Sequence, residues 1–202
     1  MIKIALEIVI TLTVAYIIGS IPTGYLIVKG FRKEDIRKIG SGSTGATNVK
    51  RVMGKKWFFI VMLLDAFKGA LPVLLAKYLT FSFAQLGLLP VIAAIAVILG
   101  HSKSIFLGFT GGKSVASGVG TILALNWQVG LILAAIWGTI TYLTRYVSVG
   151  SIIALGVSPI LMWVFKAPLA YVGYCLLGAI YIIYLHRENI LRLIAGNENK
   201  VR

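Results

Sequence analysis

Glycine and hydroxyl residues alternate in one short stretch of the sequence, and a basic residue follows them. The stretch Gly40–Asn48 reads GSGSTGATN, and Arg51 comes three residues later. Closely spaced glycines let the backbone adopt positive φ and present successive N–H groups to an anion. The hydroxyls and the Arg51 guanidinium add donors that suit phosphate geometry. We interpret the stretch as a phosphate-binding loop, and an ordinary flexible linker is the alternative.

A second glycine-rich stretch, Phe109–Ser114, lies between two apolar segments and reads FTGGKS. Gly111, Gly112 and Lys113 stand directly before the second of these segments. If that segment begins a helix there, its N-terminus directs N–H groups and a positive dipole end at an anion. The alternative is a plain turn between helices whose lysine reaches toward the membrane surface.

Polar residues also gather after the last apolar segment. His186 and Asn189 are three residues apart, which places them on one face of a helix, and Arg192 follows. Ser148 and Ser151 lie near Arg145 at another boundary of an apolar segment. By themselves, these residues are equally consistent with interfacial anchors and helix-capping hydroxyls.

Asp65 and Lys68 stand inside an apolar segment, three residues apart. Ionisable groups in such a position are costly and are usually paired. We therefore predict a structural ion pair that holds helices together.

Several common catalytic patterns are absent from the sequence. His101 and His186 have no acidic or cysteine neighbours at metal-ligand spacing, so we predict no metal site and no cofactor. The sequence has no G-x-S-x-G motif and no His-x4-Asp motif. With only 6 acidic residues, catalysis by paired carboxylates is also poorly supported.

The elements that position these residues must lie in a membrane. Hydrophobic residues make up 58% of the 202 residues and charged residues 13%, against roughly 25% charged in soluble domains. The formal charge of +14 would suggest nucleic-acid binding in a soluble protein. In a membrane protein, basic cytoplasmic loops explain that charge, so no nucleic-acid partner is expected.

The sequence predicts an all-α integral membrane protein with seven transmembrane helices in a single polytopic domain, 1–202. A bilayer crossing needs about 20 apolar residues, and segment 114–144 is long for one crossing and short for two. If it turns near Asn126, the basic segments all fall on one side of the membrane, with the N-terminus outside and the C-terminus cytoplasmic. Residues 197–202 are expected to fray. The expected spans are 4–28, 57–78, 86–107, 114–126, 128–144, 149–165 and 168–185.

Taken together, the motifs resemble the bacterial acyl-phosphate:glycerol-3-phosphate acyltransferases, nearly from end to end. They are Gly19–Pro22, Gly40–Asn48, Gly54–Lys56, Asp65–Gly69, Gly100-His101, Gly108–Lys113, Arg145–Ser148 and His186–Asn189. Each is modest alone, but their order and spacing are specific.

The resemblance implies transfer of a fatty acyl group from acyl phosphate to the 1-hydroxyl of glycerol 3-phosphate, giving lysophosphatidic acid and phosphate for phospholipid biosynthesis. It also implies a bacterial inner (cytoplasmic) membrane protein whose active site faces the cytoplasm. The expected partners are glycerol 3-phosphate, fatty acyl phosphate, membrane lipid and the enzyme that produces acyl phosphate.

The resemblance also implies roles for individual residues. The catalytic residues would be Ser41, Lys113, His186 and Asn189. The substrate-binding residues would be Gly42, Ser43, Gly45, Thr47, Asn48, Arg51, Gly111, Gly112, Ser148 and Ser151. Three positions depart from the family pattern: Ser43 stands where asparagine is frequent, Thr110 where lysine is common and Ser114 where glycine is common.

Two other classes of protein compete with this interpretation. A transporter of small organic phosphates would suit basic loops and broken helices, but transporters place their polar site near the membrane midplane. A non-catalytic scaffold for anionic lipids would explain the basic loops. The scaffold would leave Ser41–Asn48 and Gly111–Lys113 without a purpose.

Overall fold

The structure is a computed structural model that describes residues 2–79 and 87–201. Across these residues the secondary structure is helical, apart from one isolated β-bridge between Ser104 and Thr110. Internal contacts divide the chain into two compact units, Met1–Thr121 and Ile122–Arg202. Helix α6 (Val115–Leu125) runs across their boundary. The all-α class predicted from the sequence is confirmed.

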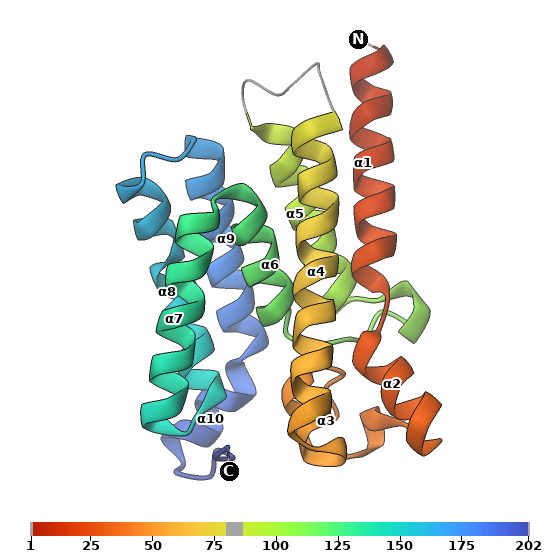
Figure 1. Ribbon diagram of the computed structural model, residues 1–202, viewed down its shortest axis with the longest axis vertical. Helices are drawn as coiled ribbons and strands as arrows, with labels where there is room; N and C mark the ends of the chain where they lie inside the picture. The colour runs from red at the N-terminus through yellow and green to blue at the C-terminus, as the bar shows by residue number, and fades with distance from the viewer. Residues whose placement is uncertain (1, 80–86, 202) are drawn as a thin grey trace. The chain divides into compact units, whose positions relative to one another are not determined.

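In the first unit, three apolar helices form the frame. Helix α1 (Ile2–Ser20) packs along α5 (Leu88–Ser102), and α4 (Lys55–Leu79) contacts both (Figure 1). The shorter elements of this unit are α2 (Thr23–Arg32), η1 (Ile36–Lys38), α3 (Ala46–Met53) and η3 (Ile105–Leu107).

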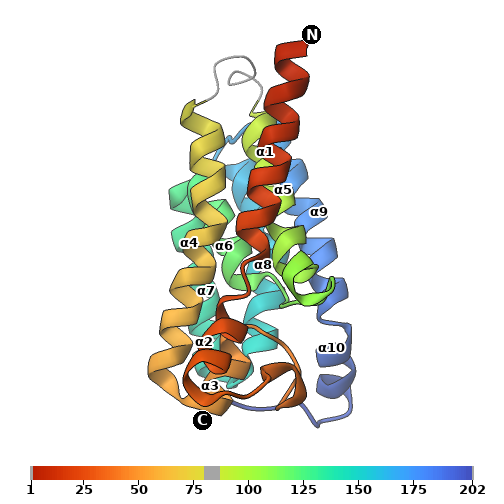
Figure 2. The same ribbon diagram turned by 90° about the vertical axis from the view of Figure 1, so that its right-hand side faces the viewer.

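The first apolar segment, expected as one span over 4–28, is broken at Ile21 and Pro22. Proline has no N–H to donate and disfavours a helical conformation in the residue before it. Helix α2 begins at Thr23, turns away from the line of α1 and continues to Arg32 (Figure 2). Its last turn is basic, and it ends at Lys33, whose φ is 60°.

The predicted ion pair between Asp65 and Lys68 lies beside this break. The Lys68 Nζ is 2.9 Å from the Asp65 Oδ1, and both side chains are buried. Lys68 also donates a hydrogen bond of 2.6 Å to the Ile21 carbonyl, and the Thr23 hydroxyl donates to Asp65. The pair therefore also provides hydrogen-bond partners for polar groups on both sides of the break. The sequence predicted the ion pair but not these additional contacts.

The basic segment between α2 and α4 is partly helical, whereas the sequence suggested a loop through Asn48. Helix α3 begins at Ala46, directly after the Gly45 N-cap. Apolar residues anchor the segment in a small core formed by Val28, Ile36, Val49 and Val61. The glycine-rich loop is consequently held between packed elements.

The segment after α4 also departs from the expected span over 86–107. Residue 86 lies outside the described residues, and α5 ends at Ser102. The chain then turns, and the Ser104 hydroxyl donates a hydrogen bond of 2.6 Å to the Ser20 carbonyl at the end of α1. The second glycine-rich loop follows this anchor.

In the second unit, α8 (Val147–Val164) contacts both α7 (Trp127–Thr144) and α9 (Leu169–Leu185). The Asn126 side chain accepts a hydrogen bond from the Val129 N–H and caps α7, so segment 114–144 is divided at the residue that the sequence indicated. Helix α10 (Arg187–Ile194) follows α9 at a bend of 58°.

By length and composition, four helical segments among the described residues can cross a membrane: Ile2–Arg32, Lys55–Tyr78, Trp127–Thr144 and Val147–Val164. The bent pair α9 and α10 would make a fifth. Helices α5 and α6 are apolar but shorter than a usual span. The count of seven crossings stays a prediction.

Candidate active site

The side chain of Asn48 organises the first glycine-rich loop. It is 1% exposed, and its Oδ1 accepts a hydrogen bond of 3.1 Å from the Ser41 N–H. Its Nδ2 donates to the carbonyls of Ile39 and Ser43 at 2.9 Å and to that of Ile36 at 3.4 Å. Residues 36–43 therefore wrap around one buried amide.

This arrangement leaves the other predicted loop residues nearer the surface. The Ser43 hydroxyl accepts the Gly45 N–H at 3.2 Å, and Thr47 is half-buried in the first turn of α3. Ser41 and Arg51 are exposed. The loop thus offers a hydroxyl and a guanidinium to solvent from a backbone that Asn48 holds in place.

The second glycine-rich loop packs against His101 at the end of α5. The Gly112 N–H donates to the His101 carbonyl at 3.1 Å. A Cβ at Gly111 would collide with that carbonyl, and one at Gly112 would collide with the His101 ring, so glycine is required at both positions. The His101 Nδ1 lies 3.1 Å from the Ser117 hydroxyl and 3.7 Å from the Asp65 Oδ1. These contacts link the loop that carries half-buried Lys113, through His101, to the buried Asp65–Lys68 ion pair of α4.

At Ser114, where the family pattern commonly has glycine, the backbone adopts a conformation that favours glycine. Its φ is 58°, a left-handed conformation that glycine adopts without steric cost. The buried Ser114 hydroxyl donates to the Ile98 carbonyl at 3.0 Å, which offers this side chain a compensating contact.

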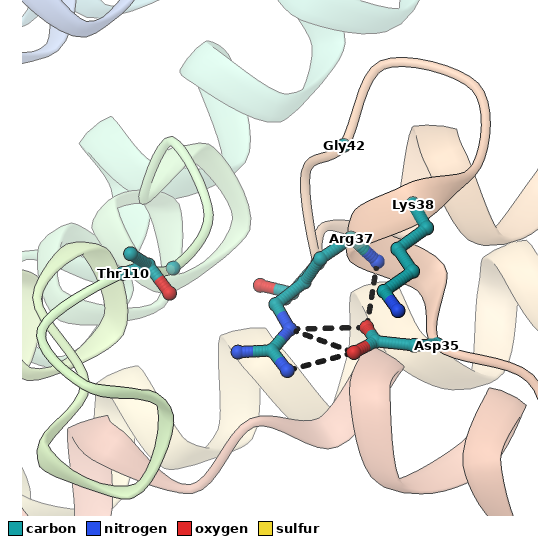
Figure 3. Close-up of a pocket in the computed structure, with 7 residues that line it drawn as sticks. Asp35, Arg37, Lys38, Gly42 and Thr110 are labelled. Atoms are coloured by element: carbon teal, nitrogen blue, oxygen red, sulfur yellow. Dashed lines mark hydrogen bonds and ion pairs between the residues drawn. The ribbon is translucent and has the colours of Figure 1, made fainter.

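A pocket of about 340 Å³ opens beside both loops in the first unit. It is lined by Asp35, Arg37, Lys38, Gly42, Thr44, Thr110 and Gly111 (Figure 3). The Arg37 Nε and Nη2 bind the Asp35 carboxylate at 2.7–3.2 Å. The side-chain hydrogen bonds from Arg37 lower the pKa of Asp35 to about 2 against the opposing effect of burial, and the Arg37 N–H and the charges of Arg37 and Lys38 add to the shift. The same pairing raises the pKa of Arg37.

In the second unit, predicted site residues converge on a carboxylate near the C-terminus. Glu198 Oε1 accepts hydrogen bonds from Ser148 at 2.8 Å and Asn189 at 2.6 Å, and Oε2 lies 2.8 Å from the Arg192 Nε. Burial opposes ionisation, but these hydrogen bonds and the Arg192 charge together lower the pKa of Glu198. The expectation that residues 197–202 fray is wrong for Glu198, because the anion-binding groups of α8 and α10 hold it.

His186 and Ser151 are buried in this unit. The His186 Nδ1 lies 2.8 Å from the Ile182 carbonyl, which can only accept, so Nδ1 carries a proton. The Ser151 hydroxyl donates to the Val147 carbonyl at 2.7 Å and accepts from the Trp137 Nε1 at 3.2 Å.

The predicted site residues are thus distributed over both units. The first unit brings residues of both glycine-rich loops to one pocket, and it also contains Ser41, Arg51 and Lys113. The second brings Ser148 and Asn189 to one carboxylate, with Ser151 in α8 and His186 at the C-cap of α9. No individual role was predicted from the sequence for Asp35, Arg37, Lys38, Thr44, His101 or Glu198.

The fold and the site define a helical membrane protein with glycine-rich, cationic loops suited to phosphate. Comparisons with known proteins agree. The glycerol-3-phosphate acyltransferase family matches residues 9–196. A glycerol-3-phosphate acyltransferase of Trichormus variabilis is 48% identical over 93% of this chain and 89% of its own length.

Solved structures of PlsY (YgiH), an integral membrane glycerol 3-phosphate acyltransferase, are also similar. Its glycerol 3-phosphate form has a TM-score of 0.90 and 35% identity, covering 96% of both chains. Its lysophosphatidic acid form has a TM-score of 0.88 and 36% identity, covering 96% of this chain and 95% of that one. The chain belongs to the glycerol-3-phosphate acyltransferase family and is an integral membrane protein.

The role of Asn48 can be tested by Asn48→Asp. The carboxylate keeps an acceptor for the Ser41 N–H but loses the amide that serves the loop carbonyls, and each buried carbonyl left unpaired costs about 1–3 kcal/mol. We expect a lower melting temperature of the purified protein in detergent and faster tryptic cleavage within residues 29–56.

The matched control is Asn126→Asp, which makes the same chemical change at a helix N-cap where aspartate caps equally well. Equal melting temperatures and cleavage rates for the two variants would contradict the organising role of Asn48.

The Glu198 contacts predict a dependence of stability on pH. Because its folded-state pKa lies below the ordinary value of 4.5, the stabilisation is present above that pH and is lost as the pH falls through the lowered pKa. Glu198→Gln should therefore be less stable than the wild type at pH 7, and the difference should shrink on acidification. Thermal unfolding between pH 3 and pH 7 measures both effects. Exposed Glu188→Gln on α10 is the control, and an equal loss in that variant would refute the assignment to Glu198.

Proposed function

We propose that this protein transfers a fatty acyl group from acyl phosphate to the 1-hydroxyl of glycerol 3-phosphate, yielding lysophosphatidic acid and phosphate in phospholipid biosynthesis. The observation that carries the proposal is the pair of phosphate-suited loops, around Ser41–Arg51 and Gly111–Lys113, in a chain of this family. The glycerol 3-phosphate and lysophosphatidic acid forms of the similar PlsY structures support the acceptor and the product. The donor is inferred from the chemistry and from the sequence resemblance.

The proposed reaction needs little from the protein except position and charge. The acceptor hydroxyl oxygen attacks the acyl carbonyl carbon, the bond from that carbon to the phosphate oxygen breaks, and phosphate leaves with the electron pair. The hydroxyl proton passes to the departing phosphate, so no covalent enzyme intermediate is required. Holding two anions in register and stabilising developing charge are the main demands.

Each site residue then has a role within this proposal. Arg51 and Lys113 offset phosphate charge, and Ser41 contacts the acceptor from the loop organised by Asn48. In the second unit, we assign acceptor binding to His186, Asn189, Ser148 and Ser151. The contact between the His186 Nδ1 and the Ile182 carbonyl fixes the ring and supports a positioning role.

We also propose seven membrane crossings, with the N-terminus outside and both glycine-rich loops facing the cytoplasm of a bacterial inner membrane. The basic loop residues support this orientation. The division of segment 114–144 at Asn126 is consistent with two crossings there. A cytoplasmic site would meet soluble glycerol 3-phosphate directly and could receive acyl phosphate from the enzyme that produces it.

The orientation predicts which loops a membrane-impermeant thiol reagent reaches in intact cells. In a Cys175→Ala background, Asn126→Cys should be labelled from outside, whereas Lys103→Cys should be labelled only after the membrane is opened. Protection of Asn126→Cys in intact cells, with labelling from the cytoplasmic side, would refute the seven-crossing topology.

The activity is tested by supplying purified protein in lipid with glycerol 3-phosphate and either palmitoyl phosphate or palmitoyl-CoA. We expect lysophosphatidic acid from palmitoyl phosphate alone and a loss of at least ~100-fold in kcat/KM for Lys113→Ala, since charge stabilisation of this kind contributes several kcal/mol. Lys77→Ala, which removes a lysine near the end of α4, should retain activity. Product from palmitoyl-CoA alone would overturn the donor, and no product from either donor by folded protein would overturn the function.

A further inference from the structure

The buried histidine at the end of α5 has no part in the reaction as proposed above. The His101 side chain lies between the ion pair of α4 and the second glycine-rich loop, all within the first unit. Its Nδ1 is 3.1 Å from the Ser117 hydroxyl of α6 and 3.7 Å from the Asp65 Oδ1 of α4. Its backbone carbonyl accepts the Gly112 N–H at 3.1 Å. One residue therefore connects α4 and α6 to the loop that carries Lys113.

The other edge of the His101 ring rests against Gly112. A Cβ at Gly112 would overlap the ring, with Nε2 as the nearest atom. The φ of Gly112 lies outside the left-handed region, so no left-handed strain would oppose an alanine there. The ring therefore accounts for glycine at this position. At Gly111, by contrast, a Cβ would meet the His101 carbonyl and the Ser102 backbone, which no change of side chain removes.

The imidazole cannot move aside easily, because the groups at its Nδ1 are themselves held. Ser117 and Asp65 are both buried. A Cβ at Gly69 of α4 would overlap the Ser117 carbonyl of α6. A Cβ at Gly120 of α6 would likewise overlap the Ala66 carbonyl of α4. Helices that approach this closely through glycine have little room to shift, so the imidazole is held from its far side by a rigid contact.

Lys113 stands between two anchors on α5. Gly112, on its N-terminal side, is held by the carbonyl and the ring of His101. Ser114, on its C-terminal side, is buried, and its hydroxyl donates to the Ile98 carbonyl at 3.0 Å. With both neighbours held, the Lys113 backbone has little freedom, and the side chain starts from a fixed Cα. A displacement of about 1 Å in such a group can cost roughly 100-fold in rate.

We propose that His101 is a positioning residue for the acyl transfer, acting through Gly112 on Lys113. The inference rests on the proposed function, because Lys113 is the group that offsets phosphate charge there. The imidazole touches neither substrate: it contacts the loop, the loop sets the Lys113 Cα, and Lys113 binds the phosphate. Its buried contacts with α4 and α6 make the ring a fixed support for the loop. Activity therefore depends on the ring at position 101 and on glycine at position 112 together.

The contact is tested by introducing Gly112→Ala into the wild type and into His101→Asn. Asparagine places an amide atom near the position of Nδ1 but has none at that of Nε2, so it keeps a partner for Ser117 and leaves room for a Cβ. The assay measures kcat/KM for glycerol 3-phosphate with palmitoyl phosphate as donor, using purified protein in lipid. Gly112→Ala should lower kcat/KM at least ~tenfold in the wild type and less than ~twofold in His101→Asn.

Gly111→Ala is the matched control, since its Cβ meets backbone in either background. It should lower kcat/KM by the same factor in the wild type and in His101→Asn. If His101→Asn relieved both alanine substitutions, or neither of them, the steric contact between the ring and Gly112 would be refuted.

A second pair of backgrounds tests whether His101 acts through Lys113. His101→Asn alone should lower kcat/KM roughly tenfold, with little change in melting temperature because Ser117 keeps its partner. In Lys113→Ala the same substitution should cost less than ~twofold, because the group that it positions is gone. Equal losses in both backgrounds would overturn the positioning role and leave the proposed function intact. Absence of turnover with palmitoyl phosphate in the wild type would overturn the proposed function and the positioning role together.

Discussion

The break between α1 and α2 is the constraint on which much of the first unit depends. A helix interrupted among apolar elements leaves backbone polar groups that must find partners, because little water is available to them. Lys68 supplies one partner through the Ile21 carbonyl, and Asp65 receives the Thr23 hydroxyl while neutralising Lys68. Neither side chain could be removed alone without leaving an uncompensated buried charge, at a cost of several kcal/mol. The break needs the hydrogen bonds of the ion pair, and each charge of the pair needs the other. The ion pair and the break therefore form one structural feature.

That feature has consequences for both glycine-rich loops. On one side, it redirects the chain into α2, whose Val28 joins Ile36 and Val49 in the small core beneath the first loop. On the other side, Asp65 lies 3.7 Å from the His101 Nδ1, and the His101 carbonyl accepts the Gly112 N–H. A continuous set of polar contacts thus links the intramembrane pair to the segment that presents Lys113. The protein can hold loop residues in fixed positions because the supporting contacts are buried, even though the loops reach the surface.

Two kinds of feature could be predicted from the sequence: contacts between residues that are near in the chain, and charged groups that would be unstable in lipid without a partner. The Asp65–Lys68 pair could be predicted because two opposite charges three residues apart in an apolar helix must find each other, and the Asn126 boundary followed from charge asymmetry. Pro22 was visible, but the apolar character on both sides of it concealed the break. Helix α3 was not predicted because its eight residues are too few to show a clear helical repeat of apolar positions. Glu198 could not be foreseen, because its partners Ser148 and Asn189 meet it only through tertiary folding.

The distribution of acidic residues follows from the demands of anion chemistry. With only 6 acidic and 20 basic residues, any carboxylate near a phosphate site would oppose binding unless a cation already engaged it. Asp35 and Glu198 are both engaged in this way, by Arg37 and by Arg192 with two neutral donors. Asp35 orients the Arg37 guanidinium, whereas Glu198 holds the chain end to α8 and α10. Both carboxylates use their charge to order cationic groups within a unit, and the chain keeps a net positive charge of +14.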